Sequence, residues 1–260
     1  MPKFFDRIAS EYKGGVAHQF LLHFNVHDLA RDAAYGYLPM LYYLMEQLNA
    51  SGCDLVIGYS PSQGLIWPSV DRWESVQKSL GFPPQEADKA NPPRTVINSK
   101  VVHEKLHEDT FITGKLPPGD ELRKNLDNLL HQGRAKVGLV INFVEKIVPN
   151  AELTTFEKER LLFLDTFQHW AMDLGMRLQK HIVLLVTSNL AEVHQALTKN
   201  ADMPTIEIPF PSYQERLEFI EYLMNLPIPD NPVEDTRFHT PVTLAPGISK
   251  EQFARDTTGA

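Results

Sequence analysis

The stretch that decides the fold is IVLLVTSNL at residues 182–190, followed by TIEIPF at 205–210 and by SYQERLEFIEYLM at 212–224. The first two segments are short and mostly apolar, which favours buried strands over helices. A short helix is expected between them, at residues 190–198. Ser212 is a residue type that caps helices, so the third segment is predicted to be a helix that starts behind it. This order is typical of a parallel sheet covered by helices.

The same alternation extends toward the N-terminus. Further apolar runs predict strands, and apolar residues at i, i+3 and i+4 spacing predict the helices between them. The predicted fold class is therefore α/β, with a doubly wound, mostly parallel five-stranded sheet flanked by helices. The earlier strands are expected at 19–26, 53–60 and 137–144, and the earlier helices at 37–49, at 120–132 with Asp120 as N-cap, and at 154–178.

Proline-rich stretches divide the chain. Three Pro-Pro pairs punctuate residues 81–119, which we interpret as an insertion, partly extended, within the core. Pro227, Pro229 and Pro232 follow the last predicted core helix. We therefore expect an α/β core at 1–225 and a linker at 226–260. A helix-like segment stops abruptly at Ala260, so we also expect the chain to be a piece of a longer protein.

Composition limits the classes of function. Hydrophobic residues make up 43% and charged residues 22% of the chain, as in globular proteins. The formal net charge of -8 argues against nucleic acid or an anionic membrane as partner, because both require clustered Lys and Arg. Cys53 is the only cysteine, which excludes an intramolecular disulfide. With no signal peptide and no long apolar run, the expected location is the cytoplasm.

Three blocks of this sequence resemble the AAA+ ATPase family, which has a P-loop NTPase fold. IVLLVTSNL and IEIPFPSYQERLEFI resemble the family's sensor-one strand and its last core strand with the following helix. VGLVINFVEKIVP, at 137–149, resembles the Walker B strand and the residues behind it. GISKEQFARDTTG, at 247–259, resembles the opening of the helical lid. The resemblance implies a nucleotide-binding fold that usually assembles into rings.

The phosphate-binding loop that this fold requires is missing from the sequence. ATP hydrolysis needs a Gly-rich loop whose N–H groups contact the phosphates, with a Lys and a Ser or Thr. Here the turn after the first strand reads VHDLARDAAYGY, with Asp28 and Asp32 and without any Lys. Carboxylates near this helix entry repel a polyanion. The Gly114-Lys115 pair lies in the insertion, and we interpret it as a chance occurrence.

The acids and the arginine of the family's catalytic site are also missing. The resemblance places Asn142 and Phe143 where the family has its two Walker B acids, and Glu145 at a later, non-catalytic position. An amide supplies no charge for magnesium, and a phenyl ring cannot act as a base. No arginine stands between Arg177 and Arg216 to serve a neighbouring subunit. We therefore predict no catalytic residues.

Asn189 corresponds by resemblance to the polar sensor of the family. Its alternative role is that of a cap at the end of its strand. With Asn142 it forms the predicted remnant of a nucleotide-binding site.

Histidines offer two weak metal hypotheses. His23, His27 and Asp28 lie close in sequence, and His103 and His107 have helical i, i+4 spacing. His23 falls within a predicted strand, so the first group lacks the single helical face that His-x3-His ligation uses. We predict no metal site from the sequence.

The preferred interpretation is a non-hydrolysing (pseudo-ATPase) AAA+ module that serves assembly or regulation of an active AAA+ domain. We expect no cofactor in this chain, with ATP and Mg²⁺ confined to a downstream domain, and self-association or an adjacent AAA+ domain as the partner. One alternative is a divergent ATP-binding ATPase with a non-standard site. The other is a stand-alone protein-interaction scaffold.

Overall fold

The computed structural model describes residues 3–33, 36–67, 112–113, 119–132, 135–152, 158–225 and 249–256. Their contacts divide the chain into two compact units, the first ending at Ile208 and the second containing Pro209–Ala260. The predicted boundary near residue 225 stays a prediction. Most of the 81–119 insertion, Gly114-Lys115, His103, His107 and the prolines after residue 225 lie outside the described residues.

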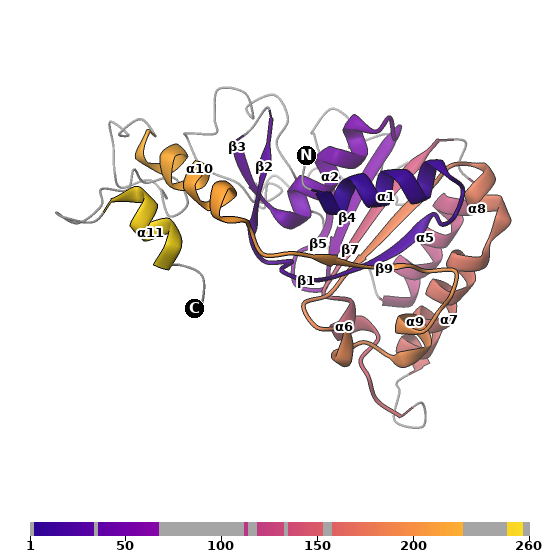
Figure 1. The fold of residues 1–260 in the computed structure, drawn as a ribbon. Helices are drawn as coiled ribbons and strands as arrows, with labels where there is room; N and C mark the ends of the chain where they lie inside the picture. Colours follow the sequence, from indigo (N-terminus) through magenta and orange to yellow (C-terminus); the bar gives the residue numbers. More distant parts are fainter. Residues whose placement is uncertain are drawn as a thin grey trace, which may run out of the picture. The chain divides into compact units, whose positions relative to one another are not determined.

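The first unit contains a seven-stranded sheet with the order β6-β5-β4-β7-β8-β1-β9 (Figure 1). All pairings within the order β4-β7-β8-β1-β9 are parallel, which confirms the predicted α/β fold and its five strands. Two antiparallel strands, β5 and β6, extend the sheet beyond β4. The strands are β1 (Gln19–Phe24), β4 (Leu55–Ser60), β5 (Gly64–Trp67), β6 (Ile112–Thr113), β7 (Val137–Asn142), β8 (Ile182–Val186) and β9 (Thr205–Ile208).

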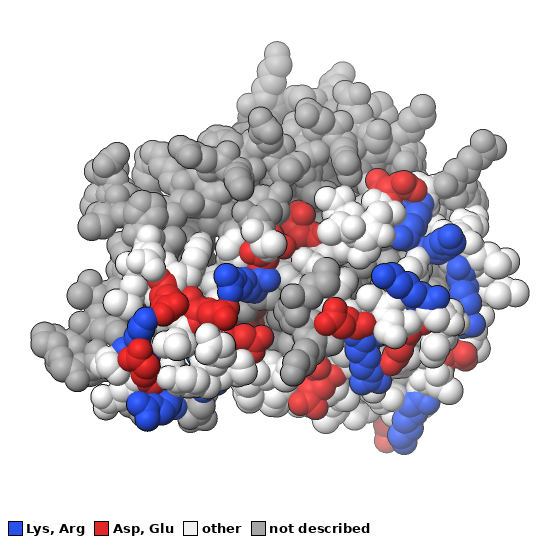
Figure 2. All heavy atoms as spheres, turned by 45° about the horizontal axis from the view of Figure 1, so that its top comes forward, with Lys and Arg blue, Asp and Glu red and all other residues white. Residues whose placement is uncertain are grey.

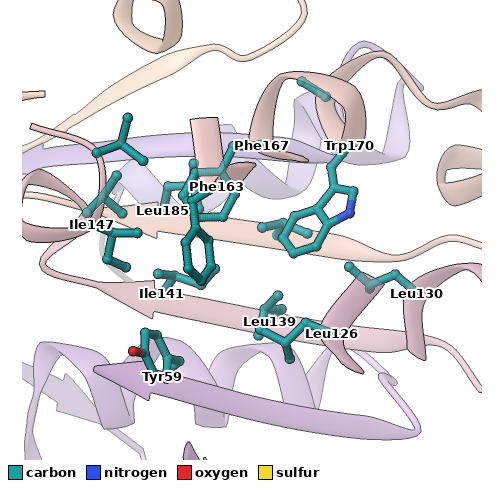
Figure 3. Close-up of a cluster of buried hydrophobic side chains, with 14 of the residues drawn as sticks. Tyr59, Leu126, Leu130, Leu139, Ile141, Ile147, Phe163, Phe167, Trp170 and Leu185 are labelled. Carbon is teal, nitrogen blue, oxygen red and sulfur yellow. The ribbon is translucent and has the colours of Figure 1, made fainter. Parts of the chain in front are cut away.

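Helices cover both faces of this sheet. One face packs against α5 (Gly119–Gln132) and α7 (Lys158–Met172), whose apolar side chains join those of β4, β7 and β8 in one buried cluster. Figure 3 shows Leu126, Leu130 and Trp170 of these helices around Leu139 of β7. The other face is covered by α1 (Lys3–Lys13) and α2 (Met40–Ala50), which contact each other through Phe4 and Tyr43.

The helix α2 lies unusually close to β7. A Cβ atom on Gly138 would stand 3.1 Å from the Leu48 Cβ and 3.2 Å from the Cys53 Sγ. Gly138 therefore has a structural reason to lack a side chain, since a larger residue would push α2 off the sheet.

A two-stranded hairpin stands between β1 and α2, where a loop and a helix from residue 37 were expected. It pairs β2 (Leu29–Asp32) with β3 (Gly36–Pro39), and α2 begins only at Met40. The expected helix start was wrong, because Tyr37 and Leu38 take part in strand pairing and Pro39 serves as the N-cap.

Two other predicted helices are divided, and one begins earlier than predicted. The helix expected at 154–178 ends at Met172 and resumes as α8 (Leu174–Leu178), because the Asp173 side chain accepts a hydrogen bond from the Met176 N–H as a new N-cap. The helix expected at 190–198 is a 3-10 turn η2 (Leu190–Glu192) followed by α9 (Gln195–Thr198). Asp120 is not an N-cap, because α5 already includes Gly119.

The second unit contains α10 (Tyr213–Met224) and α11 (Lys250–Asp256). The predicted cap of α10 is confirmed: Ser212 and Glu215 form a reciprocal capping box. Arg216 of α10 donates to the Ala254 carbonyl of α11 at 2.9 Å, and Lys250 pairs with Glu221. The two helices are thus joined by polar contacts.

Candidate functional site

The candidate site lies where β1, β8 and β7 end, at the carboxyl edge of the parallel sheet. These strands are neighbours, so the chain segments that follow them meet at one edge. In open α/β sheets this edge is where ligands bind. Both predicted site residues lie at this edge. Asn142 is the last residue of β7, and Asn189 lies three residues beyond the end of β8.

The turn after β1 is held by its own polar side chains. Asp28 accepts hydrogen bonds from the Asn25 side chain at 3.0 Å and from the Leu29 N–H at 2.8 Å. Phe24, the last residue of β1, has φ 81, a left-handed backbone that costs an L-residue about 1–2 kcal/mol. The chain then enters the β2–β3 hairpin, in which Asp32 accepts from the Gln47 side chain. The carboxylates of Asp28 and Asp32 are therefore engaged in hydrogen bonds that hold this segment in place.

The end of β7 carries a second left-handed phenylalanine. Phe143 has φ 57 and ψ 47, and its N–H donates to the Asn142 Oδ1 at 2.9 Å. Its ring stacks on His27 from the β1 turn, with ring centroids 5.6 Å apart and planes at 29°. Phe143, which the resemblance assigns to the family's second acid, thus forms an aromatic contact between the ends of β1 and β7.

Asn189 acts as a cap in the described structure. Its Oδ1 accepts from the Ala191 N–H at 3.0 Å, and its Nδ2 contacts the Glu192 carboxylate at 3.3 Å. Thr187, which directly follows β8, bonds with both the N–H and the carbonyl of Asn189. The capping role that the sequence left open is present, and nucleotide contact by Asn142 and Asn189 stays a prediction.

One buried acid lies close to this edge. Glu145, in the short helix α6 (Val144–Ile147), is 5% exposed, and its Oε2 has no hydrogen-bond partner. A buried carboxyl oxygen without a partner is costly, and such groups are frequently functional. The sequence assigned Glu145 a non-catalytic position, and its burial was not visible from the local pattern.

The turn does not fit a magnesium triphosphate. Residues 24–30, FNVHDLA, contain a carboxylate and neither Lys nor Arg. At 4 Å, like unit charges repel by about 1–4 kcal/mol between the limits of water and a protein surface. Burial lowers the pKa of His23 in β1, which disfavours the cationic form of this imidazole. On the face drawn in Figure 2, both acidic and basic side chains are present among the described residues.

A second candidate cluster of side chains lies at the amino end of the sheet, and the sequence analysis missed it. His131 and His169 lie in the last turns of α5 and α7, and Asp173 is the N-cap of α8, with their ligand atoms within 4.8 Å of one another. Partial burial lowers the pKa of His131, but contacts with the Asp127 carbonyl and with Asp173 outweigh it, and the pKa is raised. The available signals were the i, i+4 pairs Asp127/His131 and His169/Asp173.

None of the described helices combines the length and the apolar character that crossing a membrane requires.

Comparison with known proteins identifies the family. Residues 1–209 match the family model of the AAA+ chaperone N-terminal Rossmann-like domain, a range that contains the whole sheet from β1 to β9. No curated protein matches the sequence. The resemblance to AAA+ proteins is thereby confirmed, and the chain belongs to the family of AAA+ chaperone N-terminal Rossmann-like domains.

Proposed function

We propose that this chain is a non-hydrolysing AAA+ module that serves the assembly or regulation of an active AAA+ chaperone domain. The observation that carries the proposal lies at the carboxyl edge of the sheet. There the Phe143 ring stacks on His27, and the β2–β3 hairpin takes the place of a phosphate loop.

Electrostatics support the same proposal. A triphosphate needs N–H donors and cations at the end of β1, whereas Asp28 presents a carboxylate there and already receives two hydrogen bonds. At the end of β7, Asn142 carries no charge to hold hydrated magnesium, and its Oδ1 is engaged by the Phe143 N–H.

Glu145 favours a second candidate, a divergent ATPase with a non-standard site. A carboxyl group that is buried without a partner for Oε2 is chemically suited to act as a general base. The competing view is that this acid only stabilises α6. A third candidate is an interaction scaffold that binds no nucleotide.

One set of measurements separates the three candidates. ATP and ADP are titrated with Mg²⁺ against the purified chain by calorimetry, and phosphate release is followed in the same samples. The variant Glu145→Gln removes the charge of the buried acid, and Glu152→Gln changes an exposed acid as its control. Our proposal expects no phosphate release above the buffer rate in any of these proteins.

The outcomes are distinct. Phosphate release that Glu145→Gln abolishes and Glu152→Gln leaves intact would establish the divergent ATPase and overturn the proposal. If neither phosphate release nor nucleotide binding is found, association separates the other two candidates. The pseudo-ATPase module should associate with itself or with an active AAA+ domain in analytical ultracentrifugation, whereas the stand-alone scaffold should associate with neither.

Restoring the family's acids provides a further test. Asn142→Asp with Phe143→Glu places two carboxylates at the end of β7 but leaves the β1 turn unchanged. We expect this double variant to remain inactive in phosphate release, because no phosphate loop positions the nucleotide. Activity in the double variant would show that the β1 turn can bind a triphosphate after all.

A further inference from the structure

Three potential metal ligands converge from three helices at the amino end of the sheet. His131 and His169 lie in the last turns of α5 and α7, and Asp173 caps α8. The last turn of a helix carries unsatisfied carbonyls and partial negative charge, which favours a cation. The two imidazoles lie face to face, with ring centroids 6.0 Å apart and planes at 23°.

The orientation of His131 leaves one ring nitrogen for a cation. Its Nδ1 lies 2.8 Å from the Asp127 carbonyl oxygen, which can only accept, so Nδ1 carries a hydrogen and donates. Its Nε2 lies 2.9 Å from the Asp173 Oδ2. In a neutral ring these two atoms present lone pairs to each other, so the contact requires a proton or a metal ion between them. A backbone acceptor behind the ring is also how metal-binding histidines are usually held.

The third side chain distinguishes a metal site from a simple ion pair. His169 Nε2 lies 3.6 Å from the same Asp173 Oδ2. A tetrahedral zinc ion with bonds of about 2.0–2.1 Å has ligand atoms roughly 3.3 Å apart. The distances from Asp173 Oδ2 to the two histidine nitrogens, 2.9 and 3.6 Å, lie on either side of this value. The His169 side chain is 64% exposed, which leaves it free to close the remaining gap.

We propose that His131, His169 and Asp173 bind a divalent transition-metal ion of the Zn²⁺ type, with water as the fourth ligand. Two imidazole nitrogens and one carboxylate oxygen are the ligand types that this class of ion prefers. Water from the exposed side completes the coordination.

Neighbouring contacts hold the ligands in place. Asp173 uses Oδ1 to accept from the Met176 N–H at 3.1 Å, which leaves Oδ2 directed toward the histidines. The buried Trp170 donates its indole N–H to the Asp127 Oδ1 at 2.8 Å, next to the carbonyl that fixes His131. The bound ion would join the ends of α5 and α7 to the start of α8. This site is separate from the carboxyl edge, so it is independent of the proposed function.

The test uses the full chain, freed of metal by a chelator and then titrated with ZnCl₂ in calorimetry. His169→Ala removes an exposed ligand and should leave the fold intact, which circular dichroism checks. We expect its Zn²⁺ affinity to fall by more than about 10-fold, since even a lost hydrogen bond behind a metal ligand costs 10–100-fold. Asp173→Asn should weaken binding as well, and Zn²⁺ should raise the Tm of the unaltered chain but not of His169→Ala.

His27→Ala is the matched control, because it removes another exposed imidazole at the opposite edge of the sheet. Its Zn²⁺ affinity should equal that of the unaltered chain. A Co²⁺ titration gives an independent readout: the visible absorption of a tetrahedral site should appear in the unaltered chain and in His27→Ala, and be lost in His169→Ala. Equal Zn²⁺ affinity in His169→Ala and the unaltered chain overturns the proposal, as does a loss of affinity in His27→Ala.

Discussion

Phe143 allows a sharp test of the geometry at the carboxyl edge, because its backbone is left-handed with φ 57 and ψ 47. This conformation costs an L-residue about 1–2 kcal/mol and costs glycine nothing. The perturbation is a pair of variants, Phe143→Ala and Phe143→Gly. Both remove the ring that stacks on His27, so the difference between them reports the backbone alone.

The magnitude follows from two opposing terms. Glycine avoids the left-handed penalty of about 1–2 kcal/mol. It also loses about 0.5–1 kcal/mol relative to alanine, because its unfolded chain has more conformational freedom. Phe143→Gly should therefore have a free energy of unfolding higher than that of Phe143→Ala by about 0–1.5 kcal/mol, with a central value of about 0.75 kcal/mol. Phe143→Ala itself should be less stable than the unaltered chain by at least the roughly 0.5–1.5 kcal/mol of the ring pair.

Urea denaturation at 25 °C, followed by circular dichroism, measures these differences. Leu161, exposed on α7 with ordinary helical backbone, supplies the control pair. There Leu161→Gly should be about 1 kcal/mol less stable than Leu161→Ala, the usual order for a helix. If glycine is also the less stable residue at position 143, the left-handed backbone and the site geometry built on it are wrong.

Three further predictions concern packing, pH and capping. Gly138→Val should lower the free energy of unfolding by about 1–3 kcal/mol in urea denaturation, because its side chain meets Leu48 of α2, and an unchanged value would contradict the close packing. Burial lowers the pKa of His181, so near neutral pH the folded chain binds fewer protons than the unfolded chain. The free energy of unfolding should therefore be retained above about pH 6.5, the ordinary pKa of histidine, and fall as the pH drops below it. His181→Asn keeps an acceptor for the Val137 N–H and should lose less stability between pH 7 and 5, whereas an equal loss would exclude His181 as the source. Ser212→Ala removes the capping box and should destabilise α10 by about 1 kcal/mol, seen as faster hydrogen exchange in its first turn, and unchanged exchange would refute the capping role.

The five parallel strands could be predicted because each is a short apolar run that is recognisable by itself. β7 and β8 are buried along nearly their whole length, as residues covered on both faces of a sheet must be. The two-residue edge strand β6 could not be predicted, because its partner β5 lies far away along the chain. The strand β5 forms a short hairpin with β4, which the sequence analysis did not identify. The helix α1 was not predicted, although its segment is amphipathic.

Competing hydrogen bonds explain why two predicted helices have other bounds in the structure. Apolar periodicity continues through residue 173, but the Asp173 side chain offers the Met176 N–H a better partner and starts a new helix. Residues 37–39 have a helical pattern, but pairing with β2 holds them extended. Both outcomes depend on contacts that periodicity does not contain.

The candidate site was predictable in position and not in detail. Asn142 and Asn189 could be placed at one edge, because parallel strands end together. The stack of His27 on Phe143 joins two segments more than a hundred residues apart, and no pattern within either segment predicts it. The same holds for His131 and His169, which only the packing of α5 against α7 brings together.

The β2–β3 hairpin limits how the segment between β1 and α2 can change by point mutation. Its four paired positions, from Leu29 with Pro39 to Asp32 with Gly36, use the backbone that a phosphate loop would need. A point mutation exchanges one side chain and leaves this register in place. A phosphate loop in this position would therefore require replacement of the whole segment between β1 and α2, so point mutations are expected to diversify the side chains of the hairpin and to keep its register.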